Sequence, residues 1–585
     1  MRHRGKRSRT DSSTRIRAAS DASASEEGAG EGNDARRGGC AGRGARALAV
    51  PLEIELELRR DRPAYVLGAC ELTCAEGTCE VSGYALRAGE TATARSAPTC
   101  GSACAATTTD RAVIRARSVA RGGAYGVFEL LRADECARRG VGVTTIPRDW
   151  AARAESAALA ATRGDATALA VFGPKGVGKS TLARHCANGI VRARGACAWL
   201  DLDCGQPELT APGMVSLTIL RAPLLGPPQT HQASGAEYAG APSAPLYAGF
   251  VGDVSPQGDP EAYVRGAVAC VRAWADLGED KPPLVVNTSG WVKGLGLELA
   301  EEILREVGRH CSECHAVNIN SHVASRNVPD GVKWFIDEDA APGTNPTVHA
   351  YEVAAASAPA PRSVEIETEE TSVDTFDVAN ATASEEAVKT KDPRRTANDS
   401  RALSWLAWAR QIIAVCGDKP HEGALDLDAF EGENEAFAVT AAELMAVAPW
   451  RVAFADVTLC VPRNDLTARE ALAAFNGAVV GLLRAPRPSS RGGDAHAECV
   501  GLGIVRGVDV ETGAFHVLAP CPRSRLRDVA AFALGSLELP RALVGPNGES
   551  PYMTVGAIAN DGTGSRNIGP GRRDVLRQNA ATTPR

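Results

Sequence analysis

Apolar and polar residues follow two different periods along this chain. Residues 52–58, LEIELEL, alternate between apolar and acidic side chains, which predicts a β-strand with one buried face. In the middle of the chain, short apolar runs alternate with helix-like stretches, the pattern of a mostly parallel sheet with helices on both faces. The strand candidates there are residues 166–172, 197–203, 284–288 and 315–320.

Beyond residue 402 the pattern changes again. Short apolar runs bounded by Pro, Gly and Asp fill residues 449 to about 554, which predicts a mainly β unit with a helix near 467–475. We therefore expect a β-rich N-terminal domain at 48–148, a central α/β domain at 149–435 and a C-terminal β-rich domain at 436–560.

Three segments lack the large apolar residues that a core requires, and we expect them to be disordered. They are a basic, low-complexity tail at 1–47, an acidic insertion at about 355–400 and a tail at 561–585. The first tail contains a basic block that suits nuclear import or nucleic-acid binding, although a solvated tail explains it equally well. The block comprises Arg2, Arg4, Lys6, Arg7, Arg9, Arg15 and Arg17.

Length and charge limit the class of protein. A chain of 585 residues is too long for one ordinary core, and its 44% hydrophobic content supports several. The net charge of -7 argues against coating nucleic acid indiscriminately, so any RNA contact should be local. We find no long apolar run and no secretory signal, and we expect an intracellular protein without a membrane span.

The 17 cysteines are scattered, which indicates reduced thiols. One cluster, Cys70, Cys74, Cys79, Cys100 and Cys104, lacks standard zinc spacing. A second, Cys311, Cys314 and His315, lacks a further ligand pair. We expect neither cluster to bind a metal.

Residues 173–181, GPKGVGKST, fit the phosphate-binding P-loop pattern G-x-x-x-x-G-K-[ST]. A predicted strand precedes the motif and a predicted helix follows it, as a phosphate site requires. Main-chain amides would cradle the phosphates, Lys179 would bridge the β- and γ-phosphates, and Ser180 would ligate Mg²⁺. The predicted nucleotide-binding residues are Gly173, Pro174, Lys175, Gly176, Val177, Gly178, Lys179, Ser180 and Thr181.

Two acids, Asp201 and Asp203, follow in the next predicted strand. Strand side chains alternate, so both should project from the same face beside the P-loop. One could hold the metal or its water, and the other could polarise an attacking hydroxyl. The guanine-reading, transport-ATPase and protein-kinase motifs are missing, which favours ATP as the nucleotide.

Several separated blocks resemble the polynucleotide 5'-hydroxyl kinases, and most of all their nucleolar, pre-rRNA-processing branch. They lie in one order along residues 50–545. The blocks are LDLDCGQPELTAPGMVSLT at 200–218, PLLGPP at 223–228, FVGDVSPQGDP at 250–260, VVNTSGWVKGLGLEL at 285–299, PWRVAFADVTL at 449–459, ECVGLGIVRGVD at 498–509 and LELP at 537–540.

This resemblance implies an α/β P-loop kinase domain between two β-rich domains. It also implies catalytic roles for Lys179, Asp201, Asp203 and Arg401, with Asp203 orienting the hydroxyl and Asp201 beside the metal with Ser180. The substrate residues it implies are Gln206, Thr288, Gly290 and Trp291. Arg394 and Arg395 are the other candidates for the cation over the γ-phosphate.

The leading hypothesis is thus an ATP- and Mg²⁺-dependent kinase of RNA 5'-hydroxyl ends in pre-rRNA spacer processing, located in the nucleus and nucleolus. The resemblance further implies a HEPN-type endoribonuclease as partner. Two alternatives stay open: a nucleotide-binding scaffold with little turnover, and a kinase of DNA ends or small nucleosides.

Overall fold

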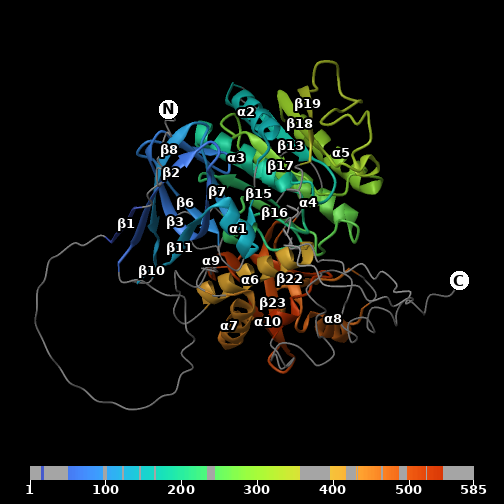
Figure 1. Cartoon of the computed structure of the whole chain (residues 1–585). Helices are drawn as coiled ribbons and strands as arrows, with labels where there is room; N and C mark the ends of the chain where they lie inside the picture. The colour runs from blue at the N-terminus through green and yellow to red at the C-terminus, as the bar shows by residue number, and fades with distance from the viewer. Residues whose placement is uncertain are drawn as a thin grey trace, which may run out of the picture.

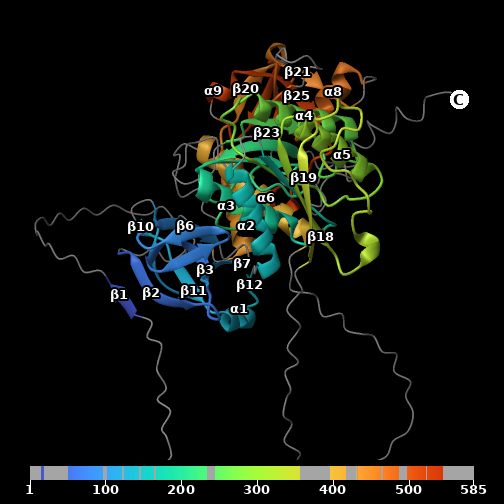
Figure 2. The same ribbon diagram turned by 90° about the horizontal axis from the view of Figure 1, so that it is seen from above.

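The computed structural model describes residues 15–18, 50–96, 102–121, 124–143, 146–163, 167–232, 244–355, 396–416, 430, 432–462, 466–485, 497–521 and 523–544. A seven-stranded sheet occupies the middle of the molecule, between an N-terminal sheet and a C-terminal sheet (Figure 1). The view from above places the two outer sheets on different sides of the central one (Figure 2).

The central sheet has the strand order β16-β15-β14-β17-β13-β18-β19. Its parallel strands are β13 (Thr167–Phe172), β14 (Cys197–Asp201), β17 (Leu284–Asn287), β18 (Glu313–Asn320) and β19 (Thr347–Ala354). Two further strands, β15 (Met214–Leu220) and β16 (Tyr247–Phe250), extend it antiparallel. The four predicted strands are all present, but β14 ends two residues earlier than predicted.

Helices cover both faces of this sheet. Successive residues of each strand point to opposite faces, so apolar residues all along a strand pack against helices on both sides. Leu169 and Val171 pack with α2 (Arg148–Arg163) and α3 (Lys179–Arg194). Ala168 and Ala170 pack with α4 (Pro260–Ala275) and α5 (Leu295–Gly308) on the other face. The predicted P-loop architecture, a mostly parallel sheet between two layers of helices, is confirmed.

The N-terminal region forms a ten-stranded sheet, with α1 (Ala133–Arg139) after β11 and the two-stranded pair β9 (Ala120–Arg121) and β10 (Ala124–Tyr125) beside it. Its strands are β1 (Arg15–Ala18), β2 (Leu52–Arg59), β3 (Ala64–Glu76), β4 (Thr78–Val81), β5 (Tyr84–Arg87), β6 (Thr91–Ser96), β7 (Ser102–Thr107), β8 (Arg111–Ser118), β11 (Phe128–Leu131) and β12 (Gly142–Val143).

The alternating segment at 52–58 lies within β2, as predicted. The expectation of disorder throughout residues 1–47 is wrong at β1, which pairs with β2 in antiparallel register. Arg15 lies opposite Glu55 and Arg17 opposite Glu53. An edge strand offers unpaired main-chain groups with which a further strand can pair.

The C-terminal sheet has the order β20-β24-β23-β22-β25-β21. Its strands are β20 (Trp450–Ala453), β21 (Thr458–Cys460), β22 (Val479–Arg484), β23 (Cys499–Asp509), β24 (Ala514–Leu518) and β25 (Val529–Leu534). The predicted helix is α8 (Ala468–Phe475), which Thr467 caps by accepting a hydrogen bond from the amide of Glu470. Short helices α9 (Arg523–Leu526) and α10 (Arg541–Val544) flank the last strand, and short 3-10 turns include η2 (Pro228–Thr230), η3 (Ala324–Arg326) and η6 (Phe454–Asp456).

Helices α6 (Ala397–Cys416) and α7 (Glu433–Ala446) belong to the same core as the C-terminal sheet. Trp405 and Trp408 of α6 are buried there, together with Leu502 and Leu518 of the sheet. The predicted boundary at 435–436 falls inside α7. Most of the predicted acidic insertion, residues 356–395, lies outside the described residues.

Within the described ranges, no helix is long and apolar enough to cross a membrane. No group of three or more His, Cys, Asp or Glu side chains in those ranges is placed to hold a metal ion. Cys100 and the tail at 561–585 lie outside them.

Candidate active site

The P-loop connects β13 to α3, and its glycines are required by close contacts. Gly173 has φ 140°, and a Cβ there would lie 2.6 Å from the Ile319 carbonyl oxygen. Gly178 precedes α3 with φ 101°, and its Cβ would lie 2.7 Å from Cη2 of Trp150. Only glycine avoids both the backbone strain and the overlap. The loop therefore brings main-chain amides and the N-terminus of α3 to one place.

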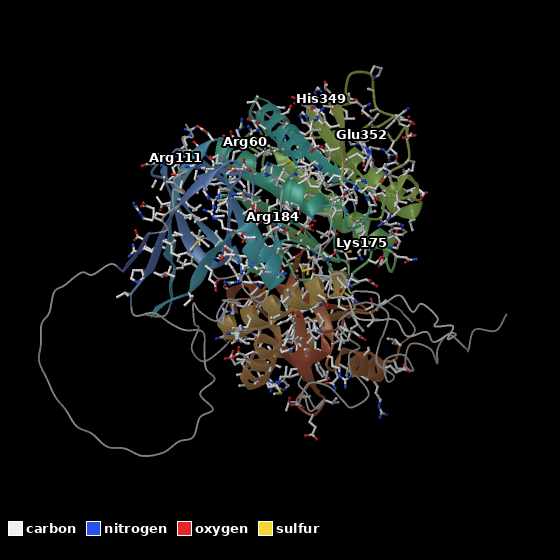
Figure 3. All side chains as sticks on the ribbon, in the orientation of Figure 1. Arg60, Arg111, Lys175, Arg184, His349 and Glu352 are labelled. Carbon is white, nitrogen blue, oxygen red and sulfur yellow. The ribbon has the colours of Figure 1, made fainter. Side chains whose placement is uncertain are left out.

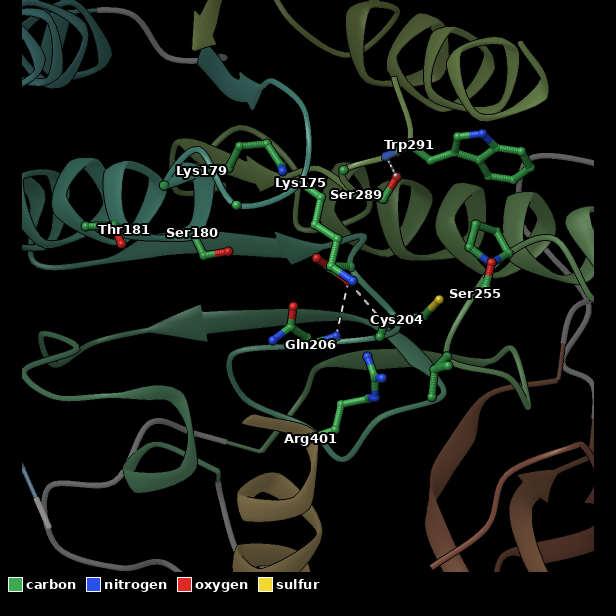
Figure 4. A pocket seen from close by; sticks show the side chains of 17 residues that line it. Lys175, Lys179, Ser180, Thr181, Cys204, Gln206, Ser255, Ser289, Trp291 and Arg401 are labelled. Atoms are coloured by element: carbon green, nitrogen blue, oxygen red, sulfur yellow. Dashed lines mark hydrogen bonds between the residues drawn. The ribbon is translucent and has the colours of Figure 1, made fainter. Parts of the chain in front are cut away.

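A cavity of about 660 Å³ opens beside this loop (Figure 4). Predicted site residues lining it are Lys175, Gly176, Gly178, Lys179, Ser180, Thr181, Asp203, Gln206, Gly290, Trp291 and Arg401. Five others do not line it: Gly173, Pro174, Val177, Asp201 and Thr288. Six lining residues were not predicted from the sequence: Cys204, Gly205, Val254, Ser255, Pro256 and Ser289.

Lys179 is nearly buried at the head of α3, and its Nζ donates to the Pro174 carbonyl oxygen at 3.1 Å. Burial lowers the pKa of this ammonium, whereas the negative charge of Asp203 acts in the opposite direction. A buried cation of this kind is stabilised when an anion enters. Lys179 is thus placed to receive a phosphate group.

Asp201, at the end of β14, is fully buried behind the cavity. Its Oδ2 accepts hydrogen bonds from the Glu208 amide at 2.7 Å and from Trp199 Nε1 at 3.2 Å. Its Oδ1 accepts from Asn287 Nδ2 at 3.0 Å and from the Asp203 amide at 3.3 Å. Asp201, predicted beside the metal, thus does not line the cavity, and its oxygens hold the loop that follows β14.

Asp203 instead lies beyond the strand, in a tight turn that lines the cavity. Its Oδ1 accepts from the amides of Gly205 and Gln206, both at 3.1 Å. Among the described residues no hydrogen bond involves Oδ2, which leaves that oxygen for a ligand. The alternation rule failed because the chain turns immediately after Leu202. The two acids therefore have different surroundings.

The donors available to a magnesium ion are the hydroxyls of Ser180 and Thr181 and the carboxylate of Asp203, which line the same cavity. Hydroxyl and carboxylate oxygens are the ligands that Mg²⁺ prefers, together with waters and phosphate oxygens. The side chains present therefore fit a magnesium–nucleotide complex.

A second buried network, which the sequence did not reveal, supports this loop. Arg184 of α3 contacts both carboxylate oxygens of Glu208, at 3.0 and 3.1 Å, and His231 Nδ1 lies 2.8 Å from the same carboxylate. Burial would raise the pKa of Glu208, but the Arg184 charge and the contact with His231 outweigh it and the pKa is lowered. The network ties the Asp203 loop to α3.

The loop after β17 contributes Ser289, Gly290 and Trp291 to the lining of the P-loop cavity. Gly290 packs against the P-loop, where an added Cβ would lie 2.9 Å from Cα of Lys175. Trp291 is half-buried at the cavity edge, directed away from the P-loop, and packs against Gly296 (Figure 4). Thr288 is buried and donates from Oγ1 to the Val171 carbonyl oxygen at 2.7 Å, so it holds the strands together instead of facing the cavity.

Arg401 reaches the cavity from α6, on the side of Gln206 (Figure 4). Its side chain is hydrogen-bonded to Asn398. Burial lowers the pKa of the guanidinium, and the negative charge of Asp203 opposes that shift. Arg401 and Asp203 are thus electrostatic neighbours across the cavity. Arg394 and Arg395 lie outside the described residues.

A second cavity of about 700 Å³ lies between the N-terminal sheet and α3. Thr181 lines both cavities, so the second lies next to the P-loop site. Polar and aromatic side chains line it, including Tyr65, Glu80 and Arg184. Its volume and lining suit a small ligand group such as a nucleoside.

Two family models match the chain. One, described as the mRNA cleavage and polyadenylation factor CLP1 P-loop, matches residues 173–310. The other, described as the NOL9-like C-terminal domain, matches residues 445–540. Together they cover the P-loop, the Asp203 loop, the Trp291 loop and the C-terminal sheet.

The chain is also similar to curated proteins named polynucleotide 5'-hydroxyl-kinase NOL9. The protein from Arabidopsis thaliana is 29% identical over 423 residues, which cover 71% of this chain and 97% of the relative. The human protein is 27% identical over 404 residues, 66% of this chain. The chain spans 52% of the length of that human relative. A solved Clp1p-Pcf11p complex aligns with 83% of this chain and 98% of its own, at 12% identity and a TM-score of 0.47.

Proposed function

We propose that this chain, which is similar to the polynucleotide 5'-hydroxyl kinases over most of its length, is itself such a kinase and transfers the γ-phosphate of ATP to the 5'-hydroxyl end of an RNA strand. One observation carries the proposal. A buried lysine, an acid with a free oxygen and an arginine from a distant helix line the same cavity. Phosphoryl transfer requires a phosphate clamp, an orienting base and a cation over the transferred group.

In the proposed mechanism, the P-loop amides and Lys179 hold the β- and γ-phosphates. The Oδ2 of Asp203 accepts the proton of the attacking 5'-hydroxyl, while Oδ1 stays in its turn and fixes the carboxylate. Arg401 stabilises the charge that develops on the transferred group. Ser180 would hold Mg²⁺, with the Asp203 carboxylate lining the same cavity, and the ion would supply positive charge to the phosphate oxygens.

We assign the nucleoside of ATP to the second cavity, because Thr181 lines both cavities. Trp291 at the outer edge suits stacking of the first base of the acceptor strand, worth about 1–3 kcal/mol per base and tolerant of sequence. These assignments place the two substrates at opposite ends of the P-loop cavity.

We further propose that the substrate is pre-rRNA, that the protein works in the nucleolus and that a HEPN-type endoribonuclease is its partner. These finer statements rest on the resemblance to the nucleolar branch. Recovery of such a nuclease with the tagged protein from cells, and nucleolar fluorescence of the tagged chain, test them.

The decisive experiment incubates the full chain with γ-labelled ATP, Mg²⁺ and matched 5'-hydroxyl RNA and DNA oligonucleotides. We expect label on RNA with the wild type and none with Lys179→Ala. Asp203→Asn keeps Oδ1 and its turn, so it should retain ATP binding but lose about 10²–10⁴-fold in rate.

A control, Asp280→Asn, changes an exposed acid in the loop before β17 and should have no effect. Full transfer by Asp203→Asn would contradict its proposed role. Labelling of DNA alone would contradict RNA as the substrate, and failure of the wild type to label any end would favour the scaffold alternative.

A further inference from the structure

Three cations lie on three loops that contact one another beside the P-loop cavity. Lys175 is at the tip of the P-loop, Lys293 follows the Trp291 loop, and Arg326 is in the η3 turn after β18. All three are exposed. We call this set the basic rim.

Contacts hold these loops together. Arg326 Nη2 donates to the Lys175 carbonyl oxygen at 3.2 Å, and Lys293 Nζ donates to the Ser325 carbonyl oxygen. Gly290 fits closely against Cα of Lys175. The rim is therefore a built feature whose backbone is fixed relative to the phosphate site.

The rim cations differ from their neighbours in having no acidic partner. Elsewhere in the same domain, Lys333 pairs with Glu338, and Arg309 pairs with Glu306 and Asp337. No such ion pair involves a rim residue within the described part of the chain. In a protein with a net charge of -7, unneutralised cations gathered at one cavity mouth leave a local site for an anion.

The position of the rim limits what that anion can be. Lys175 lines the P-loop cavity itself, on the same side as Gly290 and Trp291. Val254, Ser255 and Pro256, which also line this cavity, carry no charge. Figure 3 shows Lys175 well apart from Arg60 and Arg111 of the N-terminal sheet, so the rim is separate from the cations there.

We propose that the basic rim binds backbone phosphates of the acceptor strand, on the 3' side of the nucleotide that carries the reacting hydroxyl. This inference rests on the proposed function, since it takes the 5'-hydroxyl to lie at Asp203. A strand that enters past Trp291 then meets Lys293 and Arg326, whose charges fix its register without reading its sequence. These two are positioning residues for the acceptor.

The test compares the wild type with the double variant Lys293→Gln/Arg326→Gln. Binding of a fluorescent 5'-hydroxyl RNA decamer is measured by anisotropy over a range of salt concentrations, and KM for RNA and for ATP are measured in parallel. Each phosphate contact to a single strand contributes about 0.7 to the steepness of the slope of log affinity against log salt. The double variant lacks two such contacts, so its slope should be less steep by about 1.4. From about 50 to about 200 mM salt, wild-type affinity should then fall about sevenfold further than that of the variant. KM for ATP should not change.

Two controls separate charge from structure. Lys333→Gln/Arg138→Gln also removes two exposed cations, but from surface ion pairs away from the mouth, and should keep the wild-type slope. Arg326→Lys keeps the charge and should largely restore the slope lost in Arg326→Gln. If Arg326 only braced the P-loop, both of its variants would behave alike.

An unchanged salt slope in the double variant would overturn the inference. If the wild type binds RNA with a slope that depends on the rim yet transfers no phosphate, the proposed function fails and the basic rim stands. If the wild type transfers phosphate but the salt slope of RNA binding is the same in the double variant, the proposed function stands and the inference about the basic rim fails.

Discussion

Gly178 provides the sharpest test of the phosphate-site geometry. Replacing it with alanine adds a Cβ at φ 101°, a backbone conformation that costs a residue other than glycine about 1–3 kcal/mol. The same Cβ would lie 2.7 Å from Cη2 of Trp150, and overpacking of this kind costs about 1–3 kcal/mol more. The ring cannot move away easily, because it is buried and its Nε1 donates to the Ala354 carbonyl oxygen at 2.8 Å.

We therefore expect Gly178→Ala to lower the free energy of unfolding by about 2–6 kcal/mol. Gly195→Ala is the matched control at the other end of α3, since Gly195 has φ 76° and nothing lies within 4 Å of its added Cβ. That variant should show only the cost of the backbone conformation. Urea unfolding followed by circular dichroism measures both.

A double-mutant cycle isolates the contact with the ring. Trp150→Phe removes the outer ring atoms and is destabilising by itself, but in that background Gly178→Ala should cost about 1–3 kcal/mol less than in the wild type. Equal costs in the two backgrounds, or a Gly178→Ala cost no larger than that of Gly195→Ala, would refute the reasoning.

Two further predictions concern the cavity and the loop behind it. Arg401→Gln should lower kcat by about 10³-fold or more while the chain still binds ATP, which single-turnover kinetics with labelled ATP will show; an unchanged kcat would assign this role to another cation. Burial raises the pKa of Asp201 from 3.8 to about 7, so between these pH values the folded chain keeps a proton that the unfolded chain releases. The contribution of Asp201 to the free energy of unfolding therefore falls as the pH rises through that window. Asp201→Asn should remove this part of the pH dependence of the free energy of unfolding, measured by urea unfolding from about pH 5 to pH 8. The same pH dependence in both proteins would contradict the raised pKa of Asp201.

The features of the fold that can be predicted from the sequence are those with a local signal. The P-loop, its preceding strand and its following helix are contiguous, so motif and hydrophobic period together predicted the geometry around Lys179. Asp203 was correctly associated with that loop, because β13 and β14 lie in one parallel sheet and end at the same edge.

Features that depend on a turn or on residues far apart in the sequence could not be predicted. Asp201 and Asp203 were expected on one face, but β14 stops at Asp201 and the turn sends the two carboxylates to different surroundings. The contacts of Glu208 with Arg184 and His231 join a helix and two loops, and no spacing rule indicates such a network. Thr288 lies in the NTSGW segment that resembles the kinases, yet its hydroxyl donates a hydrogen bond to the Val171 carbonyl oxygen of β13 and does not face the cavity.

The helix that carries Arg401 has a consequence for how the protein can be divided. Because Trp405 and Trp408 of α6 are packed into the core of the C-terminal sheet, a fragment that stops after residue 416 would retain the P-loop, Asp203 and Arg401 but expose two indole rings to water. A minimal folded fragment must therefore extend through the last strand of that sheet, and the C-terminal region cannot be exchanged as an independent module without moving Arg401.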